Sequence, residues 1–273
     1  MTKLLLLVGL LFVSVSGFSQ EDGSIQIENI KTIDAAAKDI YSDVFNNLIY
    51  VTEDNEVGKY DISLDSTYFY SVDKSFSIDH IDTNNPLNIL LYSSDLKKII
   101  TLDKNLRETS TFDLLDLQDL EITLACLSSD DNLWIYDQSS GSVKKIDKSG
   151  KELFSSPILI DIFGYELSPV SMVESSNYVF INDLERGVHL FDGFAQPSTT
   201  FGEKGIESMS IIDYTIYYEK DGNILSFVVP TNDLNIVIPI AAVTTDKFET
   251  AIANSQHLFI QKEKAIEIYK ITK

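Results

Sequence analysis

The chain has 273 residues, of which 44% are hydrophobic and 11% aromatic, and its 42 acidic and 21 basic side chains give a formal net charge of −21. This acidic excess excludes nucleic acid as a partner and disfavours an anionic membrane surface, because both need clusters of Lys and Arg. The hydrophobic content is sufficient for one large core or a ring of cores. Cys126 is the single cysteine and cannot form an internal disulfide, and its apolar neighbours predict a buried thiol.

The first residues have the composition of an export signal. Residues 1–19 contain a lone Lys3, an apolar stretch over 4–13 and a small-x-small ending at Gly17 and Ser19. This pattern predicts a cleaved secretory signal peptide over 1–19, followed by a single domain over 20–273. The absence of a cysteine near this junction argues against a lipoprotein anchor. No later apolar run approaches the length of about 18 residues that a membrane helix needs, so we expect no direct membrane insertion.

A repeat extends through the rest of the chain. Six times, a short apolar run rich in aromatic residues is followed, after a few polar residues, by a second apolar run. The first runs of the six pairs are residues 48–51, 89–92, 133–136, 178–181, 215–218 and 257–260, and successive runs start 37 to 45 residues apart. A period of roughly 40 to 50 residues with several short strands is typical of a β-propeller blade. The sequence therefore predicts an all-β fold.

Each repeat is interpreted as four strands, with polar turn residues between them. The third repeat shows this best, with strands predicted at 122–127, 133–136, 142–147 and from 151 to 154. In the other repeats, strands are predicted at 41–45, 48–52, 56–62 and 67–72; at 88–92 and 97–102; at 170–174, 178–182 and 187–191; at 206–212, 215–218, 223–228 and 235–240; and at 248–253, 258–261 and 265–271. The sixth repeat thus ends one strand short.

The missing strand is predicted at the other end of the chain. Residues 24–33 alternate Ile25, Ile27 and Ile30 with polar residues, as an outer strand does. We therefore predict a six-bladed propeller that is closed by the N-terminal strand, which removes the exposed edges at the seam. Seven blades remain the alternative if the segment 103–120, of which residues 113–120 are acidic and leucine-rich, contains an extra hairpin. That segment is otherwise a short helix or projecting loop, or an outer strand with a linker.

The sequence contains no recognisable catalytic or metal-binding pattern. His80, His189 and His257 do not have the spacing of zinc ligands, and neither an HExxH nor a G-x-S-x-G motif occurs. Acidic residues are so frequent that neighbouring pairs are expected by chance. We therefore predict no catalytic residues, no metal site and no cofactor, and expect that the protein is not an enzyme.

An aspartate recurs at the end of the third strand in four repeats. Asp61, Asp103, Asp147 and Asp192 share this position, whereas the fifth repeat has Val229 there. An aspartate before a turn accepts hydrogen bonds from the backbone N–H groups of the following residues. The recurrence therefore predicts turn caps rather than a ring of metal ligands.

The repeat over 132–137 and 143–147, Asn-Leu-Trp-Ile-Tyr-Asp and Val-Lys-Lys-Ile-Asp, is similar to quinoprotein-like and NHL-like propellers of Bacteroidota. The Gly-Phe-Ser-Gln ending of the signal also resembles signal peptides of this group. With its export signal, length, acidic charge and single domain, the whole chain resembles the periplasmic propellers that serve as plug subunits of the type IX secretion translocon. The resemblance implies a non-enzymatic, periplasmic protein that docks one propeller face on a large outer-membrane β-barrel.

Three functions are compatible with the sequence. The first is a rigid protein-interaction module, since propeller loops gather on two flat faces. The second is a glycan-active hydrolase or lyase, which needs three or more carboxylates or histidines to converge in the channel, and the third is a small-ligand-binding propeller. The candidate partner contacts of the interaction module are Tyr68, Phe69, Tyr70, Phe163, Tyr165 and Phe194. Each of these aromatic side chains could instead pack between blades.

Overall fold

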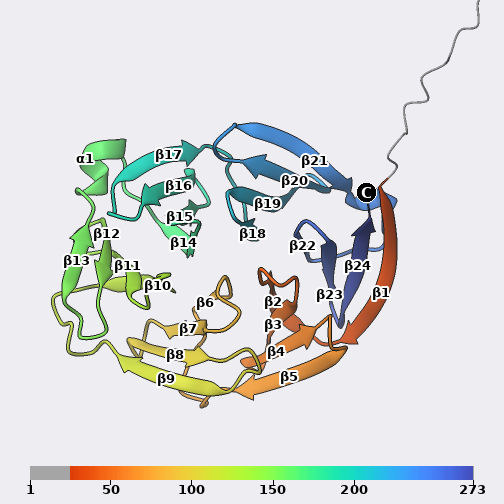
Figure 1. Ribbon diagram of the computed structural model, residues 1–273, viewed down its shortest axis with the longest axis horizontal. Helices are drawn as coiled ribbons and strands as arrows, with labels where there is room; N and C mark the ends of the chain where they lie inside the picture. The colour runs from red at the N-terminus through yellow and green to blue at the C-terminus, as the bar shows by residue number, and fades with distance from the viewer. Residues whose placement is uncertain (1–24, 273) are drawn as a thin grey trace, which may run out of the picture.

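The computed structural model describes residues 25–272, and these form a closed ring of six four-stranded antiparallel sheets around a central channel (Figure 1). The predicted six-bladed β-propeller is confirmed, and the described residues contain no seventh sheet. The predicted signal peptide over 1–19 lies outside the described residues. No helix within residues 25–272 is long and apolar enough to cross a membrane.

In each blade we name the strands A to D, from the channel outward. Blade 1 contains β2 (Ala37–Ser42), β3 (Leu48–Thr52), β4 (Glu56–Asp61) and β5 (Ser66–Ser71); blade 2 contains β6 (His80–Asp82), β7 (Ile89–Ser93), β8 (Lys98–Leu102) and β9 (Glu108–Asp113); blade 3 contains β10 (Ile122–Leu127), β11 (Leu133–Asp137), β12 (Ser142–Ile146) and β13 (Glu152–Ser155). Blade 4 contains β14 (Pro169–Ser175), β15 (Tyr178–Asp183), β16 (Gly187–Asp192) and β17 (Pro197–Phe201); blade 5 contains β18 (Met209–Ile212), β19 (Thr215–Lys220), β20 (Asn223–Val228) and β21 (Asp233–Pro239); blade 6 contains β22 (Thr250–Ala253), β23 (His257–Lys262), β24 (Ala265–Thr272) and β1 (Gln26–Asp34). Two short helices, α1 (Leu159–Phe163) and η1 (Ile240–Ala242), follow the D strands of blades 3 and 5.

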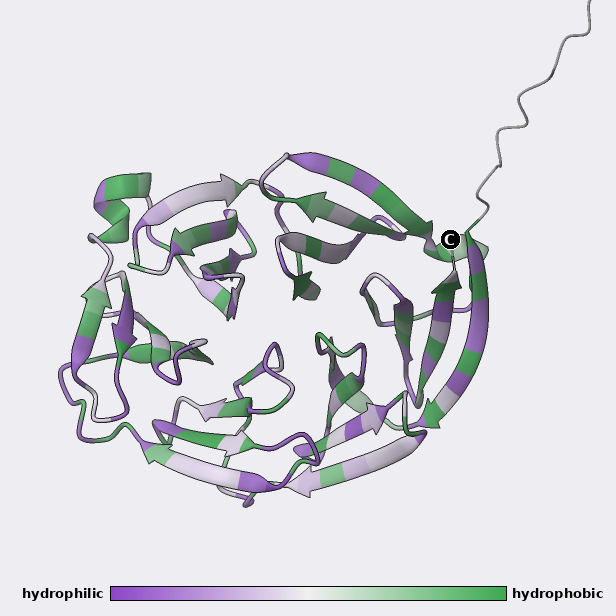
Figure 2. Cartoon of the chain, in the orientation of Figure 1, coloured by the Kyte–Doolittle hydropathy of each residue, from purple (hydrophilic) through white to green (hydrophobic). Residues whose placement is uncertain are grey.

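The six apolar runs that revealed the repeat are the B strands of the blades. Side chains of these strands, such as Ile49, Leu91 and Trp134, are fully buried. They pack between neighbouring blades; Trp134 of blade 3 and Met172 of blade 4, for example, belong to one apolar cluster. The D strands have one exposed face, and hydrophilic and hydrophobic residues alternate along β1 (Figure 2). The core is thus a ring of apolar layers between blades.

The N-terminal strand closes the ring as predicted. β1 pairs antiparallel with β24, with Gln26 opposite Thr272 and Ile33 opposite Ile266, and it forms the outermost strand of blade 6 (Figure 1). The register shifts between Asn29 and Lys31, as in a β-bulge. Because β24 is covered by β1, blade 6 has four strands like the other five, and the seam exposes no additional edge.

The A strand of blade 1 begins and ends earlier than the predicted 41–45. The Asp43 carboxylate accepts hydrogen bonds from the N–H groups of Phe45 and Asn47, at 2.9 and 2.8 Å, and so fixes a turn within the predicted strand. Val44 and Phe45, whose apolar character suggested a strand, lie exposed in this turn. The prediction was wrong because these apolar side chains do not enter the core.

The segment 103–120 forms an outer strand and a linker. β9 is the D strand of blade 2, and turns follow it as far as Leu120. The helix alternative for this segment is wrong, as is the extra hairpin. A helix instead occurs between blades 3 and 4, where α1 lies on the outer rim of the ring (Figure 1). The sequence analysis did not predict it, because five residues are too few for a helical period to show.

The recurring aspartates are turn caps, as predicted. Asp103, Asp147 and Asp192 each accept two backbone hydrogen bonds, from the residues two and four positions later, at 2.8 to 3.0 Å. Asp61 accepts one from the N–H of Leu64 at 3.1 Å. Each carboxylate therefore fixes the turn between the C and D strands of its blade.

The up-and-down order of the strands sorts the turns onto two faces. Since adjacent strands are antiparallel, the A–B and C–D turns lie on one face of the ring, which we call the AB face. The B–C turns and the connections from each D strand to the next A strand lie on the other, which we call the BC face. All four capping aspartates are in C–D turns and therefore lie on the AB face.

Candidate functional site

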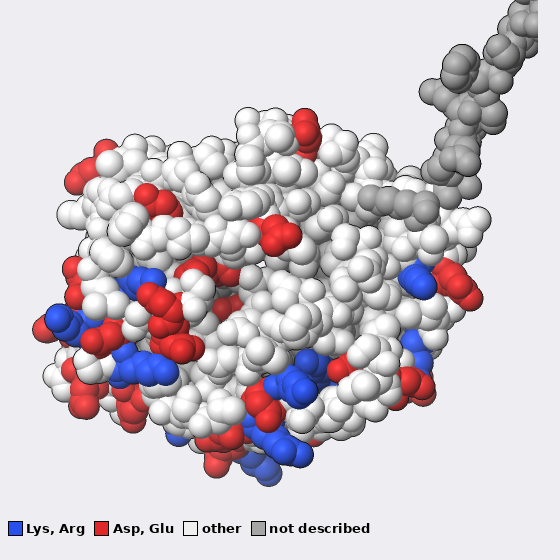
Figure 3. All heavy atoms as spheres, viewed as in Figure 1, with Lys and Arg blue, Asp and Glu red and all other residues white. Residues whose placement is uncertain are grey.

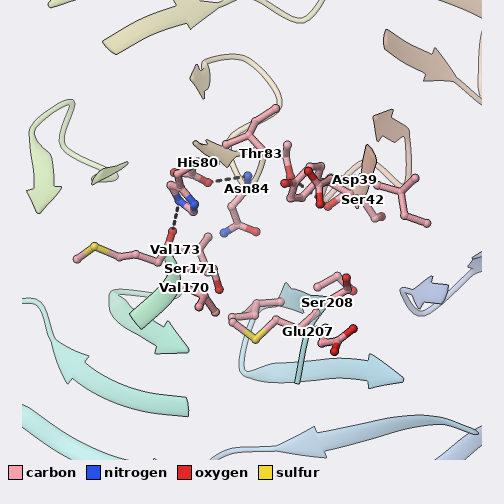
Figure 4. Close-up of a pocket in the computed structure, with 18 of the residues that line it drawn as sticks. Asp39, Ser42, His80, Thr83, Asn84, Val170, Ser171, Val173, Glu207 and Ser208 are labelled. Atoms are coloured by element: carbon pink, nitrogen blue, oxygen red, sulfur yellow. Dashed lines mark hydrogen bonds between the residues drawn. The ribbon is translucent and has the colours of Figure 1, made fainter. Parts of the chain in front are cut away.

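The central channel contains a cavity of about 320 Å³ (Figure 4). Its walls are the A strands of four blades, β2, β6, β14 and β18, together with the residues just before β6 and β18. Among the described residues, none from β10 or β22, the A strands of blades 3 and 6, lines it. The channel of this six-bladed ring is thus bounded by four blades.

Contacts between their neighbouring blades explain why blades 3 and 6 are set back from the channel. In front of blade 3, the His80 Nε2 atom of β6 lies 3.0 Å from the carbonyl oxygen of Met172 in β14, and the Asn84 side chain donates to the carbonyl oxygen of Glu174 at 2.6 Å. Blades 2 and 4 therefore meet directly. On the other side, β2 and β18 approach each other in front of blade 6.

Acidic side chains gather where the channel opens on the BC face. Asp39, Asp79 and Glu207 lie near or just before the beginnings of three A strands, and Lys38 is the basic residue among them. The Lys38 Nζ atom is 3.9 Å from the Asp39 carboxylate. Burial raises the pKa of Asp39 above its ordinary value. Asp79 is held by Ser94, whose backbone N–H and hydroxyl both donate to it, at 2.8 and 2.6 Å. This end of the cavity is rich in hydrogen-bond acceptors.

His80 lies in the wall of the cavity and is 92% buried, with 8% of its surface exposed. Its Nε2 atom faces the carbonyl oxygen of Met172, which can only accept, so the ring carries its proton on Nε2. Burial lowers the pKa of His80 to about 4, and the ring is therefore neutral near pH 7. The Nδ1 atom forms no hydrogen bond with another described residue.

The channel opens on the AB face into a second hollow of about 440 Å³, which polar residues line. Asp82 of blade 2 lies at its base and is 3% exposed. Its carboxylate accepts hydrogen bonds from the N–H groups of Asn84 and of Leu127 in blade 3, at 3.0 and 2.9 Å. Burial, and to a smaller extent the charge of Glu174, raises the pKa of Asp82 to about 6.

Glu174, from blade 4, joins blade 3 from the opposite side. Its carboxylate accepts hydrogen bonds from the hydroxyl of Ser128 at 2.7 Å, from the N–H of Ser129 at 3.1 Å and from the indole N–H of the buried Trp134. Asp82 and Glu174 thus hold the AB end of blade 3 between them. The sequence analysis did not single out either residue, since each is one of many carboxylates.

Within the described residues, no group of three or more His, Cys, Asp or Glu side chains is arranged to hold a metal ion. The convergence that would have favoured the hydrolase or lyase is therefore not seen in this part of the chain. His189 and His257 are buried in β16 and β23, away from the cavity lining. Cys126 is fully buried, as predicted, and burial raises the pKa of its thiol well above the ordinary value.

Three of the candidate partner contacts lie on β5, the D strand of blade 1. The exposed fraction of Phe69 is 57%, and its side chain points outward. Tyr68 and Tyr70 are half-buried against the apolar cluster between blades 1 and 2. The Tyr70 hydroxyl also donates to the carboxylate of Glu108 at 2.8 Å. Phe69 is therefore the most accessible of the three.

The other three candidates lie around the junction of blades 3 and 4. Phe163 and Tyr165 are half-buried against the cluster between these blades, and their rings stack with centroids 5.8 Å apart. Phe194 lies in the C–D turn of blade 4, on the AB face, with 63% of its surface exposed. Its ring meets that of Phe154 edge to face, with centroids 5.3 Å apart. The structure does not bring the six candidates together into one patch.

Other exposed apolar side chains gather on the AB face of blades 1 and 2. Val44 and Phe45 lie in the A–B turn of blade 1, Leu64 in its C–D turn and Leu87 in the A–B turn of blade 2. Their exposed fractions are 36%, 58%, 62% and 60%. Val44 also borders the AB hollow. We call these four residues the AB apolar group.

Charge is unevenly distributed over the ring. On the side shown in Figure 3, charged side chains are most frequent over blades 1 to 3, whereas the surface of blade 5 is mostly uncharged. Acidic side chains also border the central opening (Figure 3). This agrees with the carboxylates that line the channel.

Comparisons with known proteins establish the fold only. No protein-family model and no curated protein matches the chain. Among solved structures, a protein of unknown function from Bacteroides thetaiotaomicron superposes with a TM-score of 0.61 and 10% identity, over 91% of this chain and 76% of that one. Virginiamycin B lyase from Staphylococcus aureus gives a TM-score of 0.52 and 11% identity, over 86% and 79%. A chain of the Mitotic Checkpoint Complex gives 0.58 and 8%, over 97% and 100%.

These neighbours include an enzyme, a component of a protein assembly and a protein of unknown function. At such low identity the similarity extends to the β-propeller architecture and not to the residues of a site. The function of this chain must therefore be argued from its own channel and faces.

Proposed function

We propose that this protein is a non-enzymatic, exported interaction module that acts in the periplasm as a plug or accessory subunit of an outer-membrane secretion translocon. The resemblance of the chain to such plug subunits supports this proposal. A structural neighbour that is part of the Mitotic Checkpoint Complex shows that a ring of this shape can serve within a protein assembly.

The observation that carries the proposal is the AB apolar group. Phe45, Leu64 and Leu87 each expose more than half of their surface, and all three lie in turns on one face of two adjacent blades. Apolar side chains gathered on one face are typical of a protein-binding surface, because docking removes them from water. Phe194 lies on the same face, in blade 4. We therefore propose that the AB face docks on the translocon.

Affinity purification from native membranes tests this function. The tagged wild-type protein is expected to recover a large outer-membrane β-barrel in stoichiometric amount. A Phe45→Asp, Leu64→Asp double variant is expected to lose the barrel, since a charge in an apolar interface remains unpaired. The matched control is a Leu234→Asp, Ile236→Asp double variant, which changes two exposed apolar residues on β21, the outer strand of blade 5, outside blades 1 and 2.

Two results contradict the proposal. Recovery of the propeller without a barrel, from membranes in which the translocon is intact, removes the subunit role. Equal retention of the barrel by both double variants assigns the contact to another surface. Circular dichroism and thermal unfolding of the purified variants establish that each is folded.

A further inference from the structure

We propose that the central cavity binds a small organic amine. This inference goes beyond the docking role, because the cavity lies inside the ring rather than on the AB face. It depends on which hydrogen-bonding groups face the cavity, on the charge at its BC end and on its size.

The first step is the excess of acidic over basic side chains in the cavity wall. The carboxylates of Asp39, Asp79 and Glu207 can only accept hydrogen bonds when ionised. The Asn84 amide, which could donate, already donates to the carbonyl oxygen of Glu174 at 2.6 Å. Lys38 is the one basic residue in the lining. Hydroxyl groups in the lining can donate as well as accept, so it is the negative charge of the wall that favours a ligand with a positive charge and N–H donors.

The second step is the free ring nitrogen of His80. The carbonyl oxygen of Met172 fixes the proton on Nε2, which leaves the Nδ1 lone pair as an acceptor without a partner among the described residues. The side chain is 92% buried and lines the cavity, so water or a ligand reaches this nitrogen from the cavity. In Figure 4 the His80 ring lies in the wall of the cavity, with Ser171 and Val170 from β14 nearby. A donor on the ligand would satisfy this nitrogen.

The third step is the shape of the space. Val170 and Val173 of β14 and Met209 of β18 line the cavity and keep part of their surface exposed, so apolar surface lies beside the polar groups. Its volume of about 320 Å³ is at the lower end for small-molecule sites. A ligand with an ammonium group and an aliphatic chain matches this cavity, because its charge can lie among the carboxylates at the BC end and its chain against the apolar side chains. A bare metal ion matches it less well, since no described group of three ligands could hold one.

The test uses three probes of equal length and different charge. These are 1,5-diaminopentane, 1,5-pentanediol and glutarate, titrated into the purified full-length protein by isothermal titration calorimetry at physiological salt. The diamine is expected to bind saturably in a 1:1 ratio and at least about tenfold more tightly than the diol, as the loss of one charge-assisted hydrogen bond predicts. Glutarate is expected not to bind.

Variants separate the cavity from the acidic surface as the binding site. An Asp39→Asn, Glu207→Gln double variant is expected to weaken diamine binding at least about tenfold. An Asp119→Asn, Glu263→Gln double variant makes the same change in net charge at two exposed residues outside the cavity lining, and should bind like the wild type. His80→Phe, which removes the Nδ1 acceptor, is expected to weaken binding in the same direction.

Three outcomes overturn the proposal. The first is no saturable diamine binding at millimolar concentration. The second is binding that does not distinguish the diamine from the diol. The third is equal weakening by the two carboxylate double variants, which would show that the amine acts as a counterion of the acidic surface. If His80→Phe does not fold, the carboxylate pair still decides the question.

Discussion

Blades 3 and 6 are both set back from the channel, and yet they are held in different ways. Blade 3 is held by two carboxylates, Asp82 of blade 2 and Glu174 of blade 4, which accept hydrogen bonds from its N–H and O–H groups. Blade 6 is held by neutral groups: the Asn254 amide donates to the Ser42 hydroxyl at 2.7 Å, and the Gln261 amide to the carbonyl oxygen of Ala37 at 2.7 Å.

The two blades therefore differ in how their stability depends on charge. Hydrogen bonds to a charged acceptor are stronger than neutral ones, but a buried charge also has a desolvation cost that depends on pH. Blade 3 should therefore depend strongly on its carboxylates and on pH. Blade 6 is held by neutral groups and should depend on neither.

The largest effect is expected from removing the carboxylate that anchors blade 3 to blade 4. Glu174→Ala leaves the N–H groups of Trp134 and Ser129 and the hydroxyl of Ser128 without their acceptor. We expect the free energy of unfolding to fall by about 3 to 5 kcal/mol, since each buried donor without a partner costs about 1 to 3 kcal/mol. Urea unfolding followed by tryptophan fluorescence measures this change.

The control for this variant is Glu185→Ala. Glu185 is exposed in the B–C turn of blade 4, and its loss should change the free energy of unfolding by no more than about 0.5 kcal/mol. A similar small effect of Glu174→Ala would show that its carboxylate does not hold blade 3.

The second largest effect is the pH dependence of the stability that Asp82 contributes. Burial raises the pKa of Asp82 to about 6, so the folded protein favours the protonated carboxyl. The stability that this contributes is fully present below the unfolded pKa of about 4 and is lost as the pH rises through 6. Asp82→Asn, which cannot ionise, should therefore be more destabilising relative to the wild type at pH 4 than at pH 7.5. The difference should be up to about 3 kcal/mol, at about 1.4 kcal/mol per pKa unit.

Urea unfolding of both proteins at a series of pH values measures this difference. Comparison with the wild type cancels the contribution of His80, whose pKa is lowered and whose effect on stability has the opposite sign. A destabilisation by Asp82→Asn that is constant between pH 4 and 7.5 would contradict the raised pKa.

The smallest effect is expected in blade 6. Asn254→Ala removes the bond to Ser42 and the acceptor for the N–H groups of Gln256 and His257, at 2.9 and 2.8 Å. We expect a loss of about 2 kcal/mol in the free energy of unfolding, because the groups concerned are neutral. The loss should not change with pH. Asn235→Ala, at an exposed residue of β21, is the matched control with no expected effect. A loss as large as that of Glu174→Ala would remove the distinction between the two blades.

Much of the fold could be predicted because the B strands are buried on both sides. A strand between two blades needs consecutive apolar residues, so runs such as that from Leu133 to Tyr136 stand out in the sequence. The closing strand could be predicted because Ile27 and Ile33 alternate with polar residues on the outer edge of blade 6. In both cases the pattern of apolar residues along one strand indicates which of its faces are buried.

The A strands and the site were harder to predict, because they face the channel. Lys38 and Asp39 make β2 look like a loop, whereas the exposed Val44 and Phe45 make the next turn look like a strand. Asp82 and Glu174 differ from other carboxylates only in the blades that surround them, and no local pattern records that. The AB apolar group was missed for a similar reason, since its members belong to three separate turns that the fold places on one face of two adjacent blades.

The pairing of β1 with β24 has a consequence for the order of folding. β1 is synthesised before every other described strand and pairs with β24, the last of them, so the ring cannot close until β24 has been synthesised. Contacts between segments so distant in sequence form slowly, because a long loop must first be ordered. Until then β1 has no partner and the edge of β24 is open, which exposes the nascent protein to wrong strand pairing. A chaperone that holds the chain in an extended state during this interval would act on these two strands.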